Sequence, residues 1–103
     1  MKQDNPHNLI DETIHQRTRL AIMATLAGVE SLSFGELKAR LALTDGNLST
    51  HLAALERAGF VKITKSFRGP KPLTTLAQTA KGRKALSNYV ALLQSILDKA
   101  QQE

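Results

Sequence analysis

The sequence predicts a mainly α-helical domain with one small β-hairpin and a long C-terminal helix. Three observations indicate this class. Apolar residues recur at helical spacing through most of the chain, the period changes to two only at about residues 60–76, and a helical pattern then continues almost to the end. A chain of 103 residues, 42% of them hydrophobic, fits one domain with one core.

We expect the first eight residues to form a flexible arm, because they are polar and include a proline. The domain itself is then expected to span residues 9–103. From Leu9 to Leu26 the apolar residues follow a helical period, and Gly28 is placed to end this helix. Thr18 lies in a polar interruption of the apolar stripe and could cap a second helical piece.

Two short helices joined by a tight turn are predicted next. Ser33 and Glu36 have the Ser-x-x-Glu spacing of a capping box, which starts a helix over residues 34–42. Thr44 is the N-cap of a second helix, predicted at about 45–58. Because only about two residues join them, these helices must cross at a large angle, which is the geometry of a helix-turn-helix.

The hairpin and the last helix complete the order of elements. Alternating β-rich residues over about 60–76 surround the turn sequence Arg68-Gly69-Pro70-Lys71-Pro72, which predicts a hairpin with a basic tip. Thr79 then caps a helix of about six turns, predicted at 79–101. A helix, a helix-turn-helix, a hairpin and a long helix, in that order, make a winged helix.

The last helix has a broader apolar face than a domain of this size needs for its own core. This surplus favours a partner helix, most simply from a second copy of the chain. The alternative is a cover over the chain's own core. The residues expected at a dimer interface are Leu9, Ile10, Leu86, Tyr89, Val90, Leu93, Ile96 and Leu97.

Positive charge is concentrated in the second half of the chain. The formal net charge is +5, yet residues 58–97 carry seven Lys and Arg residues and no acid. Such a run is often no more than a solvated face. A one-signed field of this length also attracts a polyanion, and a pI near 9.9 raises the question of nucleic acid.

Composition excludes several classes of protein. The absence of Cys excludes disulfides and thiolate metal sites, and no run is apolar enough for a membrane span or a secretory signal. With three Phe, one Tyr and no Trp, a base-stacking platform for single strands is poorly supplied. We therefore expect a soluble protein of the cytoplasm.

The string Leu-Thr-Asp-Gly-Asn-Leu-Ser-Thr-His-Leu at 43–52, with Leu-Glu-Arg-Ala-Gly-Phe-Val at 55–61, resembles the recognition helix of MarR/ArsR-type winged-helix repressors of bacteria and archaea. It is most similar to a compact subfamily in which the winged helix is almost the whole protein. The resemblance extends over about residues 9–97. Two positions depart from the family pattern: Arg17 stands where Pro is frequent, and Leu76-Ala77-Gln78 replaces a Tyr-x-Leu, which predicts shorter strand pairing.

A recognition helix lies in the major groove and reads base edges from near its N-terminus. If Leu48, Leu52 and Leu55 face the core, polar residues of the same helix face outward. Asn47 can make a two-point contact to adenine, and a partly buried, hydrogen-bonded role is expected for His51 ahead of a phosphate contact. The candidate DNA-reading residues are Asp45, Gly46, Asn47, Ser49, Thr50 and His51.

Basic residues outside this helix are expected to hold the DNA backbone. Lys65, Arg68 and Lys71 surround the hairpin turn, which could enter the adjacent minor groove. Lys38 and Arg40 could clamp phosphates from the preceding helix. Each set also has an ordinary explanation, because polar residues are common in a first helical turn and basic residues in a solvated hairpin edge.

The function predicted on these grounds is a homodimeric, sequence-specific regulator of transcription. It would act, as a repressor, on double-stranded DNA with a pseudo-palindromic operator. The alternative is a winged helix that docks other proteins without reading DNA. An enzyme is disfavoured, since the chain has no Gly-rich phosphate loop, nucleophile elbow or paired carboxylates.

No cofactor or metal is expected. His7, His15 and His51 are dispersed and lack the spacing of metal ligands. A small-molecule effector could bind between the first and last helices, although no residue pattern identifies one.

Overall fold

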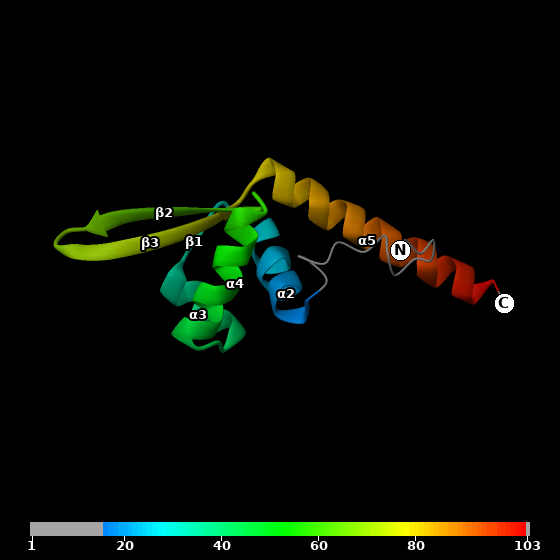
Figure 1. The fold of residues 1–103 in the computed structure, drawn as a ribbon, viewed down its shortest axis with the longest axis horizontal. Coiled ribbons are helices and arrows are strands. Elements are labelled where there is room, and N and C mark those ends of the chain that lie inside the picture. The colour runs from blue at the N-terminus through cyan, green and yellow to red at the C-terminus, as the bar shows by residue number, and fades with distance from the viewer. Residues whose placement is uncertain (1–15, 103) are drawn as a thin grey trace.

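The computed structural model describes residues 16–102. The helices are α2 (Arg17–Ala27), α3 (Phe34–Leu41), α4 (Asp45–Arg57) and α5 (Ala80–Gln101), and the strands are β1 (Leu32–Ser33), β2 (Val61–Arg68) and β3 (Lys71–Gln78). The strands form one antiparallel sheet in the order β1-β3-β2. In Figure 1 the β2–β3 hairpin extends to one side of α2, α3 and α4, and α5 extends to the opposite side. The predicted fold class is confirmed.

Helix α2 begins earlier than the Thr18 cap suggested. The Gln16 side chain accepts a hydrogen bond of 3.1 Å from the backbone N–H of Arg19, so Gln16 is the N-cap of this helix. Thr18 therefore lies inside the helix. Gly28 is the C-cap, as predicted. The N-terminal arm, and with it Leu9 and Ile10, lies outside the described residues.

The turn between α3 and α4 is set by local hydrogen bonds. Helix α3 starts at the predicted capping box, in which Ser33 and Glu36 exchange bonds of 2.9 and 3.1 Å. It stops at Ala42, whose left-handed backbone (φ 54°, ψ 47°) ends the helical path. The Thr44 hydroxyl then accepts from the N–H of Asn47 at 3.1 Å and starts α4. The helix-turn-helix is confirmed.

One apolar core holds these elements together. Leu48, Leu52 and Leu55 are at most 2% exposed, so the predicted stripe of α4 does face inward. The core residues are Ile22, Met23, Leu26, Leu32, Leu37, Leu48, Leu52, Leu55, Phe60, Val61, Leu76 and Tyr89. Because α4 supplies three of them at helical spacing, burial fixes the rotation of this helix and hence which residues it presents to solvent.

Strand pairing extends further than the sequence suggested. The register runs from Arg68↔Lys71 at the turn to Val61↔Gln78, so pairing is not shortened beyond Leu76. Gln78 is only 9% exposed, and its side-chain amide donates to the carbonyl oxygen of Met23 at 3.0 Å. That bond between β3 and α2 satisfies the buried donor of Gln78, whereas the Oε1 atom of the same amide is buried without a hydrogen-bond partner among the described residues.

Helix α5 is anchored at its first turn. The Thr79 hydroxyl donates to the Gly59 carbonyl at 2.6 Å and accepts from the N–H of Gly82 at 2.9 Å. The Thr79 N–H donates to the Phe60 carbonyl at 3.0 Å. Gly82 lies so close to this carbonyl that no side chain fits there. The end of α4, the start of β2 and the start of α5 are thus locked together.

Beyond that anchor, α5 packs on α2 and then leaves the core. Tyr89, expected at a dimer interface, is instead buried within its own chain at 7% exposure, because the first half of α5 covers the core next to α2. Val90 and Leu97 are more than half exposed. No helix within residues 16–102 combines the length and apolar character needed to cross a membrane.

Candidate nucleic-acid interface

The N-terminal half of α4 presents a polar surface to solvent. Asp45, Gly46, Asn47, Ser49 and Thr50 are all exposed, whereas Leu48 among them is fully buried. The structure therefore brings five of the six predicted DNA-reading residues onto one exposed stretch. These side chains project beside the helix N-terminus, where unpaired backbone N–H groups favour anions.

Some polar side chains on this surface already make hydrogen bonds within α4, and others do not. The Thr50 hydroxyl donates to the backbone carbonyl of Gly46 at 2.9 Å, so its donor is engaged within α4. Within residues 16–102 the side chains of Asn47 and Ser49 make no hydrogen bond. The space where a Gly46 side chain would lie is open. Asn47 and Ser49 are consequently the side chains best able to pair with an incoming acceptor or donor.

An ion pair links the two helices of the helix-turn-helix. The ammonium of Lys38 on α3 lies 2.8 Å from a carboxylate oxygen of Asp45 on α4. Asp45 is the only acid in the first turn of α4. An exposed pair of this kind contributes about 0–1 kcal/mol to stability. Its larger consequence is electrostatic, because Lys38 offsets the negative charge at the N-terminus of α4, while a second acid, the exposed Glu56, lies further along the helix in the hollow that Lys65 also lines. The other candidate clamp, Arg40, is exposed on α3.

His51 connects α4 to α2 through a hydrogen bond and is not exposed like the other five candidate DNA-reading residues. Its Nδ1 atom accepts a hydrogen bond of 3.2 Å from Nε of Arg19, and its side chain is partly buried. Burial first, and then the charge of Arg19, lowers the pKa of His51 below the usual 6.5. This confirms the expectation of a partly buried, hydrogen-bonded histidine. Arg19 was missed as its partner, since nothing in the local sequence connects residues 32 positions apart.

We expect the His51 imidazole to titrate below pH 6.5 in the folded protein. As the pH falls, the unfolded chain then binds this proton first, so the stability that His51 contributes is complete above its unfolded pKa and is lost as the pH falls through the folded pKa. NMR titration measures the pKa. The resonance of the His51 imidazole is assigned as the one that disappears in the His51→Gln variant. Arg19→Met should move the pKa of His51 upward, and a wild-type value above 6.5 would contradict the assignment.

The hairpin carries its predicted basic residues at two distances from α4. Lys65 lies beside α4, where it lines a hollow of about 220 Å³ together with Ser49 and Thr74. Arg68 and Lys71 face each other across the turn at the tip, where Gly69 adopts a positive φ of 61°. All three cations are exposed, and the tip projects away from the helices (Figure 1).

Sequence reasoning did not single out one feature of the hairpin. Phe67 is 72% exposed, the most exposed of the large hydrophobic residues within the described chain. Its place next to the turn was visible in the sequence, but its exposure follows from how far the hairpin extends beyond the core.

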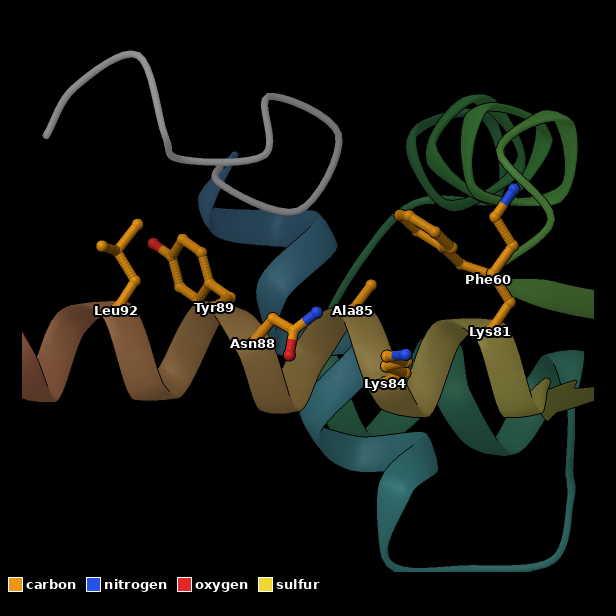
Figure 2. Close-up of a pocket in the computed structure, with 7 residues that line it drawn as sticks. All are labelled: Phe60, Lys81, Lys84, Ala85, Asn88, Tyr89 and Leu92. Atoms are coloured by element: carbon orange, nitrogen blue, oxygen red, sulfur yellow. The ribbon is translucent and has the colours of Figure 1, made fainter. Parts of the chain in front are cut away.

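A second hollow, of about 480 Å³, lies where α5 meets the junction of α4 and β2. Figure 2 shows Phe60, Ala85 and Tyr89 beside it, with Lys81, Lys84 and Asn88 projecting from α5. The Lys81 ammonium lies 5.9 Å from the centre of the Phe60 ring, a cation–π distance. Across residues 16–102, no three His, Asp or Glu side chains are grouped in a way that could hold a metal ion.

These features define a winged-helix nucleic-acid-binding protein. The chain belongs to the winged helix DNA-binding domain family, whose model matches residues 18–97. Similar solved structures include regulators of the MarR and ArsR families, as the resemblance implied, and one of the PadR family. The fold and the family are those of transcriptional regulators and not of enzymes.

Three relatives illustrate the similarity. An uncharacterised protein of Methanocaldococcus jannaschii is 46% identical over 72 residues, which are 70% of this chain and 78% of the relative. A transcriptional regulator homologue from Pyrococcus horikoshii superposes with a TM-score of 0.83 at 28% identity, covering 89% of this chain and 91% of the other. The M. tuberculosis regulator MosR, solved in complex with DNA, shares the fold at 22% identity, with a TM-score of 0.67 over 88% of this chain and 65% of its own.

Proposed function

We propose that this protein is a sequence-specific regulator that binds double-stranded DNA as a homodimer and represses transcription from a pseudo-palindromic operator in a prokaryotic cytoplasm. One observation carries the proposal. Helix α4 exposes Asn47 and Ser49, whose side chains have no hydrogen-bond partner among residues 16–102, next to a hairpin whose basic residues lie in a stretch of forty residues free of acids.

In this proposal α4 enters the major groove. The Asn47 amide pairs with adenine through one donor and one acceptor, and the Ser49 hydroxyl pairs with a base or a phosphate. Gly46 allows the backbone at the helix N-terminus to approach a phosphate closely. Thr50 accepts through its free lone pair, and His51 positions α4 on α2 through Arg19 instead of reading a base.

The hairpin acts as the wing beside this groove. Lys65 binds the phosphates that pass between α4 and β2, and Arg68 and Lys71 reach the adjacent minor groove, where a narrow groove attracts cations. Arg40 clamps a phosphate from α3, and Lys38 does so when it exchanges Asp45 for the backbone. Phosphate contacts set the register of the protein on the duplex, and the contacts of α4 select the sequence.

The homodimer is proposed to form along α5. Val90 and Leu97 are 54% and 53% exposed, and Leu86 and Leu93 are only partly buried, so this helix keeps an apolar face for a second copy. A two-fold axis at α5 would place the two α4 helices on half-sites about one turn of DNA apart. Tyr89 contributes to this interface only indirectly, by fixing α5 on the core.

Two alternatives from the sequence stay predictions. A module that docks proteins would use the same exposed face of α5 without reading DNA. A small-molecule effector was expected between the first and last helices. The hollow of Figure 2 lies elsewhere, between α5 and Phe60, and Lys81 and Lys84 beside its apolar floor would favour an acidic ligand there.

Selection of bound sequences from a random duplex pool tests the proposed function. We expect a symmetric pattern with half-sites about 10 base pairs apart, centre to centre. Affinity for the selected duplex should fall by about 10³–10⁵ between 50 and 200 mM salt, if 6–10 phosphates are contacted. Recovery of random sequences, with affinity that barely responds to salt, would instead favour the protein-docking module.

A further inference from the structure

Phe67 lies in a row of β2 residues that runs from the core to the tip of the hairpin. Alternate residues of a strand share a face, so Val61, Ile63, Lys65 and Phe67 lie on one side of β2. Along this row Val61 is 2% exposed, Ile63 is partly buried, and Phe67 is 72% exposed. The same face that closes the core at one end thus presents an aromatic ring to solvent at the other.

This face of the hairpin is the one turned toward the recognition helix. Ile63 and Lys65 line the hollow of about 220 Å³ together with Ser49 and Ala53 of α4. Phe67 is the next residue outward in that row. The DNA backbone that the proposed function places against Ser49 and Lys65 would therefore continue directly to Phe67.

The Phe67 ring lies opposite an apolar residue and close to basic residues. Phe67 is paired across the hairpin with Pro72, whose ring restricts the backbone opposite. The next pair toward the tip is Arg68 and Lys71, and Lys65 precedes Phe67 on the same face. An aromatic residue with Lys65 on its own face and with Arg68 and Lys71 at the adjacent turn matches a ligand that offers both an apolar surface and negative charge.

A groove of duplex DNA offers that combination, with sugars and base edges between two rows of phosphates. A second hairpin does not match it, since two tips would bring six cations together with no acid between residues 58 and 97 of either copy. Continuity with α4 also favours DNA over a separate protein partner.

We propose that Phe67 is an apolar wedge that enters the minor groove beside the half-site and partly unstacks one base step, with Pro72 supporting it. This inference rests on the proposed function. It adds a specificity determinant outside the recognition helix, because pyrimidine–purine steps such as TA and CA are the easiest to unstack. The selected operators should therefore favour such a step under each wing, at a position that α4 does not reach.

The test compares Phe67→Ala with Phe67→Leu on the selected duplex, in which 2-aminopurine replaces adenine at the step beneath the wing. Wild type should raise the 2-aminopurine fluorescence by unstacking it. Phe67→Ala should lose that rise and bind about 10- to 100-fold more weakly, as expected for a lost stacking contact. Its salt slope should not change, because no charge is removed. Phe67→Leu should keep part of both effects, since leucine also serves as a wedge.

Thr64→Ala is the matched control, because Thr64 is exposed on the opposite face of the same strand. It should bind and unstack like wild type. If Phe67→Ala also binds and unstacks like wild type, the wedge is wrong while DNA binding stands. If wild type fails to bind any duplex, the proposed function fails first. If Phe67→Ala changes only the oligomeric state measured by sedimentation, the ring belongs to a protein interface.

Discussion

Replacing both Arg68 and Lys71 by glutamine should weaken binding to the operator about 30-fold at 0.15 M salt. Each cation that neutralises DNA charge, in a groove or on a phosphate, releases counterions and contributes about 0.9 to the slope of log affinity against log salt, so two lost cations lower the slope by about 1.8. Extrapolated from 1 M salt, each contact is worth roughly fivefold at 0.15 M. Glutamine keeps the polarity of the side chains and removes their charge, and the exposed tip should fold as before. Fluorescence anisotropy at four salt concentrations measures the affinity and the slope together.

Lys99→Glu is the control for this experiment. It lowers the net charge of the chain by two, as the double glutamine variant does, but it lies in the last turn of α5, far from the hairpin (Figure 1). A general effect of net charge would weaken both variants equally. Equal salt slopes for the double variant and wild type would remove the wing tip from the DNA interface.

Local signals in the sequence account for most of the fold. The capping box at Ser33 and the cap at Thr44 act through hydrogen bonds to residues three positions away, so their effect can be predicted without the tertiary structure. The spacing of Leu48, Leu52 and Leu55 likewise fixed the exposed side of α4. The exposed row of candidate DNA-reading residues follows from these two kinds of signal.

Contacts between distant residues could not be predicted in this way. The Arg19–His51 bond and the Met23–Gln78 bond join residues far apart in the chain. Neither the spacing of apolar residues nor a helix-capping motif indicates which distant residues will meet. Tyr89 shows the same limit, because one apolar stripe on α5 serves both the chain's own core and an exposed face, and only the position of α2 divides the two.

The ion pair between Lys38 and Asp45 qualifies the sequence-based view of the binding surface. Both residues were predicted to contact DNA independently. In the structure their charged groups instead form an ion pair of 2.8 Å with each other. Asp45 on its own would repel a phosphate, and Lys38 on its own would attract one. Paired, they make the N-terminus of α4 nearly neutral, so in the proposed function base discrimination falls to Asn47 and Ser49 and attraction of the phosphates falls to the wing.

The junction at Gly82 should be the position most sensitive to a single added methyl group. A Cβ built on Gly82 would overlap the carbonyl oxygen of Phe60 and lie 3.0 Å from its carbonyl carbon and its Cα. These are backbone atoms, and the same carbonyl already accepts the Thr79 N–H at 3.0 Å, so no side-chain movement can relieve the clash. Gly82→Ala should destabilise the protein by about 3 kcal/mol, the upper end for overpacking. In a domain of this size that lowers Tm by roughly 15 °C, measured by calorimetry at one protein concentration.

Gly35→Ala is the control, because an added methyl group at this position should stabilise the protein instead of destabilising it. Gly35 also lies in the first turn of a helix, but no atom lies within 4 Å of its added Cβ. Alanine there should stabilise the fold by about 0.5–1 kcal/mol, through lower backbone entropy in the unfolded chain. A Gly82→Ala protein with a Tm equal to that of wild type would show that α5 can shift away from Phe60. In that case the anchor between α5 and the recognition helix would not hold the two halves of the proposed dimer at a fixed spacing, and operator half-sites of variable separation should be bound equally well.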